Sequence, residues 1–286
     1  MDVLYGLHPV EEALKAGRRR FDHILVARER HDQRLESLVA LCRHSGIRVR
    51  QEPREQLTAL AKTPAHQGVV ALVRPQDFLT LEDLYAPATP GATRLLLALD
   101  GVEDPQNLGA LLRVADGAGV DGVLLTERRS APLSPVAVKA SAGAAEHLRI
   151  ARVVNLVRAL EELKKQNLWI IGLDANPAER GSSDYDQFDL TGNCVLVLGR
   201  EGAGLHDLVR RTCDHLLRIP MSGGVSSLNV SAAGAVVLFE AFRQRRAAVR
   251  SVQGVVTRSG SAAEGAVSPI AGAVASKPKK QKGLGS

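Results

Sequence analysis

The sequence predicts an α/β protein with a small N-terminal α/β domain and a larger domain in which helices cover both faces of a mostly parallel sheet. Apolar, strand-like runs alternate with helix-like stretches through most of the 286 residues, as expected for strands joined by helices. The later strands are apolar at consecutive positions, which is typical of strands buried on both faces. A segment rich in proline and glycine separates the two domains.

The first 75 residues are expected to fold as one unit of alternating helices and strands. A domain of this length buries only a modest core, which is enough for a binding module but small for an enzyme. Helices are predicted over 7–16, over 32–43 and after Pro53, and strands over 23–27, 48–51 and 69–73.

Residues 76–92 are predicted to be a linker, because Pro87, Pro90 and Gly91 interrupt any continuous element. Strands and helices alternate again in the second domain, which is predicted over 93–248. Its strands are expected over 94–100, 122–126, 148–153, 169–175, 194–199 and 216–221, and its helices from 107, over 136–145, 155–166 and 205–211, and from about 227. Residues 249–286 lack a sustained apolar period and include a KPKKQK cluster, so a disordered basic tail is expected there.

Composition narrows the class of protein. No uncharged apolar run approaches the roughly 20 residues that cross a bilayer, and acidic residues near the N-terminus do not fit a signal peptide. We therefore expect a cytoplasmic protein without a membrane partner. Cys42, Cys194 and Cys213 are far apart and form no C-x-x-C pair, so neither a disulfide framework nor a metal site is indicated.

The net charge of +6 is unevenly distributed along the chain. Residues 1–75 hold 13 basic and 9 acidic residues, residues 76–248 hold 18 and 21, and residues 249–286 hold 6 and 1. Basic segments on either side of a slightly acidic one suit a polyanionic partner. A solvated surface with a solubilising tail is the alternative that charge alone leaves open.

Three strands lead into loops rich in glycine, asparagine, serine and single charges, and each loop opens a helix. In the first loop, Asn107 and Arg113 are expected to lie on roughly the same side of the helix. Taken separately, Asn107 could be an N-cap and Arg113 an exposed charge.

The second loop, LGREGAGL, contains Gly199, Gly202 and Gly204, which allow close approach of the backbone to a ligand. Their order is G-x-x-G-x-G and not the dinucleotide fingerprint G-x-G-x-x-G, so a nicotinamide-dependent oxidoreductase fits poorly. Glu201 could simply be an acid that complements a helix dipole.

The third loop, IPMSGGVSSLNVS, places Ser226, Ser227 and Asn229 at the start of a helix of small residues. These small residues should allow the helix to pack closely against its neighbours. Ser227 could be the N-cap of this helix, with or without a catalytic role.

Together, N-x-G-x-x-x-R, L-G-x-E-G-x-G-L and I-P-M-x-G-x-x-S-S-L-N-V-S resemble the three motifs of the SpoU (TrmH-like) RNA 2'-O-methyltransferases. The resemblance extends from residue 3 to about residue 246. Flanking phrases such as GLHPVEEAL and HQGVVALV are most similar to the bacterial branch that methylates a guanosine of 23S ribosomal RNA.

The resemblance implies a trefoil-knotted domain that binds S-adenosyl-L-methionine, a homodimer that completes the catalytic site, and a ribosomal-protein-like RNA-binding domain at the N-terminus. The residues that it assigns to the cofactor are Leu198, Gly199, Ile219, Met221 and Leu228. The residues that it assigns to catalysis are Asn107, Arg113, Glu201, Ser227 and Asn229.

The role of Arg113 has two alternatives. The resemblance suggests a base, but the pKa of a free guanidinium exceeds about 12, whereas bidentate binding of a phosphate suits it well. Arg200 and Ala203 depart from the commoner motif and leave the substrate preference open. Methylation of transfer RNA and a catalytically silent RNA-binding protein are the remaining alternatives.

Overall fold

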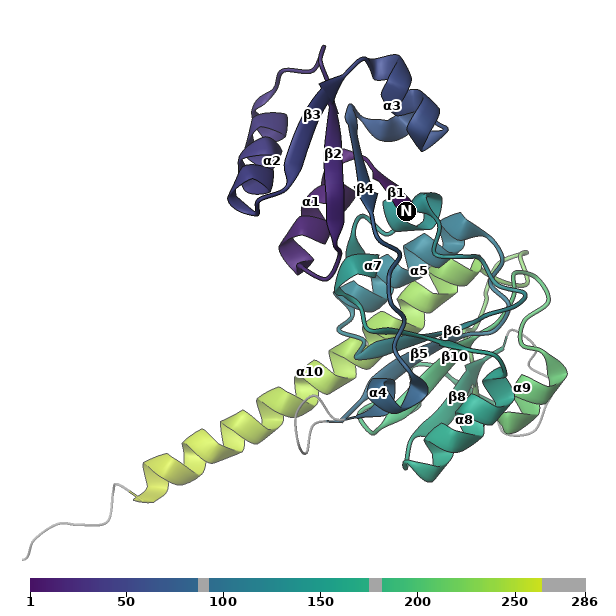
Figure 1. The fold of residues 1–286 in the computed structure, drawn as a ribbon. Helices are drawn as coiled ribbons and strands as arrows, with labels where there is room; N and C mark the ends of the chain where they lie inside the picture. The colour runs from purple at the N-terminus through teal and green to yellow at the C-terminus, as the bar shows by residue number, and fades with distance from the viewer. Residues whose placement is uncertain (87–92, 175–181, 264–286) are drawn as a thin grey trace, which may run out of the picture. The chain divides into compact units, whose positions relative to one another are not determined.

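Two β-sheets organise residues 1–245, which form one unit of the chain (Figure 1). The structure is a computed structural model that describes residues 1–86, 93–174 and 182–263, with side chains described as far as residue 250. Residues 246–286 belong to a second unit. Within the described part of the chain, no helix has both the length and the apolar character that a membrane span requires.

The smaller sheet has the strand order β1-β4-β2-β3. β4 is antiparallel to β1 and β2, whereas β2 and β3 are parallel. The sequence analysis missed β1, whose four residues are too few to show a clear period. The strands are β1 (Asp2–Tyr5), β2 (Phe21–Ala27), β3 (Arg48–Glu52) and β4 (Val69–Val73), and the helices are α1 (Leu7–Ala16), α2 (Gln33–His44), α3 (Arg54–Ala61) and the 3₁₀ helix η1 (Pro64–His66).

The larger sheet has the order β7-β6-β5-β10-β8-β11-β9, and its neighbouring strands are parallel. The predicted parallel sheet is therefore confirmed. The strands are β5 (Leu95–Leu99), β6 (Gly122–Thr126), β7 (Ile150–Val153), β8 (Trp169–Leu173), β9 (Ser182–Asp184), β10 (Cys194–Leu198) and β11 (His215–Arg218).

Helices cover both faces of this sheet, because alternate residues of its strands enter two different apolar clusters. Leu95 and Leu97 of β5 belong to the cluster that includes residues of α5, α6 and α10, whereas Leu96 joins residues of α4, α8 and α9. The helices are α4 (Leu81–Tyr85), α5 (Pro105–Gly117), α6 (Pro135–Ala140), α7 (Ala144–His147), α8 (Leu156–Lys165), α9 (Asp207–Thr212) and α10 (Val230–Ala263).

Three predicted elements differ from the structure. The helix expected over 136–145 is divided into α6 and α7, because Ala142 and Gly143 have φ angles of 52° and 93°, outside the helical range. The expected linker contains α4, which begins with a capping box between Thr80 and Asp83, while residues 87–92 lie outside the described part. α10 is helical to Ala263, well past the expected start of the disordered tail at 249, and residues 264–286 are not described.

A buried ion pair connects the segments that carry the two sheets. The guanidinium of Arg19 binds both carboxylate oxygens of Glu146 at 2.9 and 3.1 Å, and the two side chains are 3% and 1% exposed. Arg19 also donates to the side chains of Asp2 and Gln76. Removing one partner of such a pair leaves a buried charge and typically costs about 3–5 kcal/mol, so this network fixes the contact between α7 and the N-terminal segment.

Close packing around α5 depends on glycine. A Cβ atom at Gly109 would lie 2.4 Å from the carbonyl oxygen of Ala137 in α6, and one at Gly234 of α10 would lie 2.5 Å from Leu111 of α5 and 2.9 Å from Leu198 of β10. The prediction that the small residues of the last helix allow close packing is therefore confirmed. These contacts hold α5 and α10 beside the carboxyl end of β10.

The substitution Gly109→Ala should destabilise the fold by about 2 kcal/mol or more, because the new methyl group meets backbone that cannot rotate away. Gly117→Ala, on the same helix, is the matched control, since its Cβ atom would meet only Phe239 at an ordinary 3.6 Å. Urea unfolding of both variants measures the difference. Equal stabilities would contradict the close approach of α5 and α6.

Candidate active site

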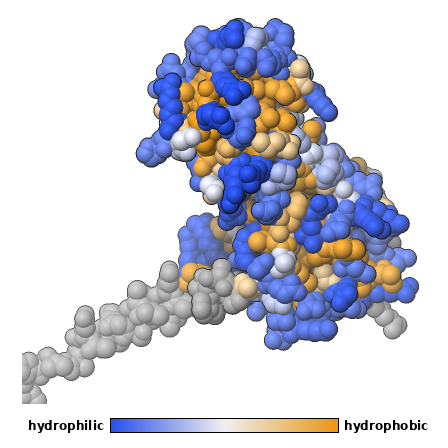
Figure 2. All heavy atoms as spheres, in the orientation of Figure 1, coloured by the Kyte–Doolittle hydropathy of each residue, from blue (hydrophilic) through white to orange (hydrophobic). Residues whose placement is uncertain are grey.

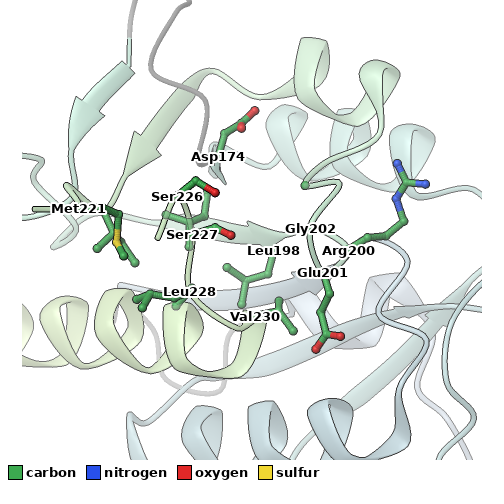
Figure 3. Close-up of a pocket in the computed structure, with 15 residues that line it drawn as sticks. Asp174, Leu198, Arg200, Glu201, Gly202, Met221, Ser226, Ser227, Leu228 and Val230 are labelled. Carbon is green, nitrogen blue, oxygen red and sulfur yellow. The ribbon is translucent and has the colours of Figure 1, made fainter. Parts of the chain in front are cut away.

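A pocket opens at the carboxyl ends of β8 and β10 (Figure 3). This is the edge at which parallel α/β sheets bind ligands. Its walls come from the end of β8, the loop that follows β10 and the segment that leads from β11 into α10. All five residues assigned to the cofactor line it, together with two assigned to catalysis: Leu198, Gly199, Ile219, Met221, Leu228, Glu201 and Ser227.

The loop after β10 turns back sharply on itself. The backbone N–H of Arg200 donates to the carbonyl of Gly204 at 2.9 Å, and the N–H of Gly204 donates back to Arg200 at 3.0 Å. A Cβ atom at Gly199 would lie only 2.3 Å from the carbonyl carbon of Gly204. Gly202 and Gly204 have φ angles of 69° and 67°, a region that favours glycine. The glycines therefore shape this loop, and the loop directs Glu201 toward α5.

A hydrogen-bonded cluster brings the three motifs together. The side-chain amide of Asn107 in α5 donates to Oε1 of Glu201. The amide of Asn229 donates to the same Oε1 atom at 3.0 Å and to Oδ1 of Asn107 at 3.1 Å. Asn107 is 9% exposed, so the cluster is buried on its α5 side and open on the side of Asn229.

The structure excludes the simpler interpretations of three residues. Asp104, and not Asn107, caps α5 by accepting from the backbone of Gln106. Glu201 precedes α9 by several residues and is therefore not in its first turn. α10 begins at Val230 and not near Ser227. Its first turn is capped by Asn229, whose Oδ1 accepts from the backbone N–H of Ser231 at 2.8 Å.

Arg113 lies apart from this cluster. Its side chain is exposed and does not line the pocket. The expectation that Asn107 and Arg113 share one side of the helix is wrong. Six residues rotate around an α-helix by about 240° beyond one full turn, so the two side chains leave the helix in different directions. Within the described residues of one chain, Arg113 makes no hydrogen bond or ion pair with another side chain.

Two acidic residues at strand ends were missed by the sequence analysis. Asp174 follows β8, lines the pocket and pairs with Arg210 of α9 at 2.7 Å. The buried carboxylate of Asp100, after β5, accepts from the backbone N–H of His206 at 2.7 Å and contacts its Nδ1 atom at 2.9 Å. Their positions at the carboxyl ends of predicted strands were the available signal. Among the described residues, no group of three or more His, Cys, Asp or Glu side chains could hold a metal ion.

The comparisons with known proteins agree with this geometry. Residues 94–239 match the model of the SpoU rRNA Methylase family, and residues 3–79 match the model for RNA 2'-O ribose methyltransferase substrate binding. The chain belongs to the SpoU family. The predicted family, fold class and enzyme class are confirmed, while the trefoil knot stays a prediction.

Curated relatives of this SpoU protein match over nearly their full length. The 23S rRNA (guanosine-2'-O-)-methyltransferase RlmB of Vibrio vulnificus is 42% identical over 246 residues, which cover 86% of this chain and 98% of the relative. The RlmB of Pseudomonas syringae pv. tomato is 42% identical over 249 residues, with 86% and 97% coverage.

Solved structures show the same fold. The SpoU methyltransferase AviRb of Streptomyces viridochromogenes, in complex with AdoMet, matches with a TM-score of 0.71 and 26% identity, covering 86% of this chain and 90% of that one. An AdoMet-bound rRNA methyltransferase of Sinorhizobium meliloti matches with a TM-score of 0.68 and 29% identity, covering 85% and 87%. The predicted methyl donor is thus bound in both neighbours.

The two functions of Asn229 can be separated by substitution. Asn229→Ser keeps an oxygen that can cap α10 but removes the amide that donates to Glu201 and Asn107, and it adds no charge, so melting temperature should change little while methyl transfer falls roughly 100-fold or more. Asn229→Ala removes the cap as well and should cost about 1 kcal/mol of stability in addition. Thermal melts and single-turnover kinetics measure the two effects. Normal activity of Asn229→Ser would exclude the cluster from catalysis.

Proposed function

We propose that this SpoU protein transfers a methyl group from S-adenosyl-L-methionine to the ribose 2'-hydroxyl of a guanosine in 23S ribosomal RNA. The single observation that supports it most is the cluster of Asn107, Glu201 and Asn229 at the edge of a pocket built from the other two motif loops. The RlmB relatives, which align over nearly their whole length, support the choice of substrate.

The pocket fits the proposed cofactor. Its lining is mainly apolar with several polar groups, which is the usual make-up of small-molecule sites. Figure 3 shows Leu198, Met221 and Leu228 around the space, side chains that suit the adenine ring and the methionine chain. The tight glycine loop and the backbone at Ile219 provide polar groups beside these apolar walls. When bound, the cofactor supplies an electrophilic methyl group.

The residues of the chain contribute mainly by positioning. In-line attack requires the 2'-hydroxyl oxygen, the methyl carbon and the sulfur to lie on one line, with the oxygen and the sulfur on opposite sides of the methyl group. Such alignment accounts for much of the rate. We assign the orientation of the ribose to Asn107 and Asn229, with Glu201 fixing both amides, and we place Ser227 beside the transferred group. Arg113 then binds the phosphate of the target nucleotide, because a guanidinium forms paired hydrogen bonds with phosphate.

A second copy of the chain is the proposed source of Arg113 for each site. An apolar stripe along α10 is exposed, with Phe239 at 47% and Phe242 at 36%, and these two rings pack against each other. Phe239 lies beside Gly117 of α5, one turn from Arg113. Exposed aromatic residues on a helix face are typical of protein interfaces. Pairing through α5 and α10 would therefore place Arg113 next to the partner.

We assign substrate binding to a domain at residues 1–75, joined by 76–92 to a catalytic domain at 93–248. The first domain has a net charge of +4, and Figure 2 shows hydrophilic residues over much of its visible surface. The basic segment 249–286 adds sequence-independent attraction to RNA. The proposed substrate places the protein in the cytoplasm.

Methylation of unmodified 23S ribosomal RNA tests the proposal directly. Incubation with labelled S-adenosyl-L-methionine should label this RNA, and mass spectrometry should find the label on one guanosine ribose. If transfer RNA alone were labelled, the substrate would be transfer RNA and not 23S ribosomal RNA. Binding of cofactor and RNA without any transfer would indicate a catalytically silent RNA-binding protein.

Mixing inactive variants tests whether two chains share each site. Equal amounts of Arg113→Ala and Asn107→Ala, allowed to exchange subunits, should recover about a quarter of wild-type activity, because half of the dimers then hold one intact site. Asn107→Ala mixed with Asn229→Ala is the matched control and should recover nothing, since both residues belong to the cluster of one chain. Recovery in neither mixture would mean that Arg113 acts within its own chain.

A further inference from the structure

Arg200 is one of two residues of the second motif that depart from the commoner pattern, and the structure holds it in a defined place. Its backbone forms both hydrogen bonds that close the loop with Gly204. Its stem lies over Gly101, where a Cβ atom would be 2.8 Å from Cγ and 3.1 Å from Cδ of Arg200. Gly101 belongs to the loop that leads from β5 to Asn107, so Arg200 connects two of the three motif loops.

Among the described residues, the guanidinium of Arg200 has no counter-charge within hydrogen-bonding distance. No ion pair involves it among the described residues, and its Nε atom is buried without a hydrogen-bond partner there. The neighbouring carboxylate of Glu201 is directed instead to Asn107 and Asn229. The buried Nε atom is closed to solvent, whereas the terminal nitrogens of the guanidinium are not among the buried atoms that lack a partner, so they are the groups that an anion from outside the chain can reach.

The direction of the side chain indicates which anion it receives. Figure 3 shows Arg200 extending away from Met221 and Leu228, which form the apolar part of the cofactor pocket. The carboxylate of the cofactor is one source of an anion, and the phosphates of RNA are the other. Arg200 lines the pocket through the loop that also carries Glu201, but its guanidinium extends away from the apolar walls, which favours a phosphate of the RNA over the carboxylate of the cofactor.

We propose that Arg200 binds a backbone phosphate of the substrate RNA next to the methylated ribose, and that it sets the position of the RNA independently of Arg113. This inference rests on the proposed function. The planar guanidinium forms two parallel hydrogen bonds with phosphate oxygens, and the contact with Gly101 holds the stem so that little side-chain freedom is lost on binding.

The test compares Arg200→Gln with Arg158→Gln, an exposed arginine of α8 that does not line the pocket. Affinity for an unmodified 23S ribosomal RNA transcript is measured by filter binding at several salt concentrations, and cofactor affinity by calorimetry. Arg200→Gln should weaken RNA binding roughly tenfold and reduce the slope of log affinity against log salt by about one. Its cofactor affinity and melting temperature should match those of the wild type.

Arg200→Lys should restore the salt slope but only part of the affinity, because an ammonium keeps the charge and loses the paired geometry. Loss of cofactor affinity with unchanged RNA binding would overturn the proposal and assign Arg200 to the cofactor carboxylate. If Arg200→Gln and Arg158→Gln weakened RNA binding equally, the loss would be a general effect of charge, and the proposal would also be overturned. RNA binding is measured without methyl transfer, so these outcomes remain distinct from failure of the proposed reaction.

Discussion

The structure of the site depends on a single carboxylate oxygen shared by two amides. Oε1 of Glu201 accepts from both Asn107 and Asn229, residues that are far apart in the sequence. Each amide donates to this oxygen, and the other polar atoms of the two side chains bond to Asp104, to Ser231 and to each other, which fixes the orientation of both side chains. The arrangement requires α5, the glycine loop and the start of α10 to converge within hydrogen-bonding distance.

That convergence follows from strand pairing and from small residues. β5 and β10 pair in parallel with Leu99 opposite Leu198, so their loops emerge at the same level of the sheet. Gly199 permits the return of the loop backbone, and Gly234 permits α10 to approach Leu198. Larger side chains at these two positions would separate the elements by more than a hydrogen bond can span, because a buried core has little free volume. The geometry of the proposed site and the packing of the core therefore both require glycine at these two positions.

The sequence predicted the large sheet's strands except β9, and it predicted the grouping of the three motifs, because continuous apolar runs and glycine positions are local signals. β9 consists of Ser182, Ser183 and Asp184 and has no apolar run. The sequence did not predict the division between α6 and α7, which depends on positive φ angles at Ala142 and Gly143. It also placed Arg113 on the side of Asn107, although a spacing of six residues puts the two side chains on different sides of a helix. The positions of Asp174 and Asp100 at the ends of predicted strands marked them as candidates, but their partners Arg210 and His206 are distant in sequence and are identified only in the structure.

The distribution of charge then explains how a partly acidic site accepts RNA. Residues 76–248 have a net charge of −3, and Glu201, Asp104 and Asp174 lie at or near the pocket. Long-range attraction must come from the basic segments at either end, because it acts over roughly a Debye length of 8–10 Å and depends little on geometry. Within the site, single guanidinium groups do a different task. Each guanidinium counters the negative charge of the carboxylates only at the position that a phosphate of the RNA is proposed to occupy. If the RNA is bound one nucleotide out of place, its phosphates lie near carboxylates and not near an arginine.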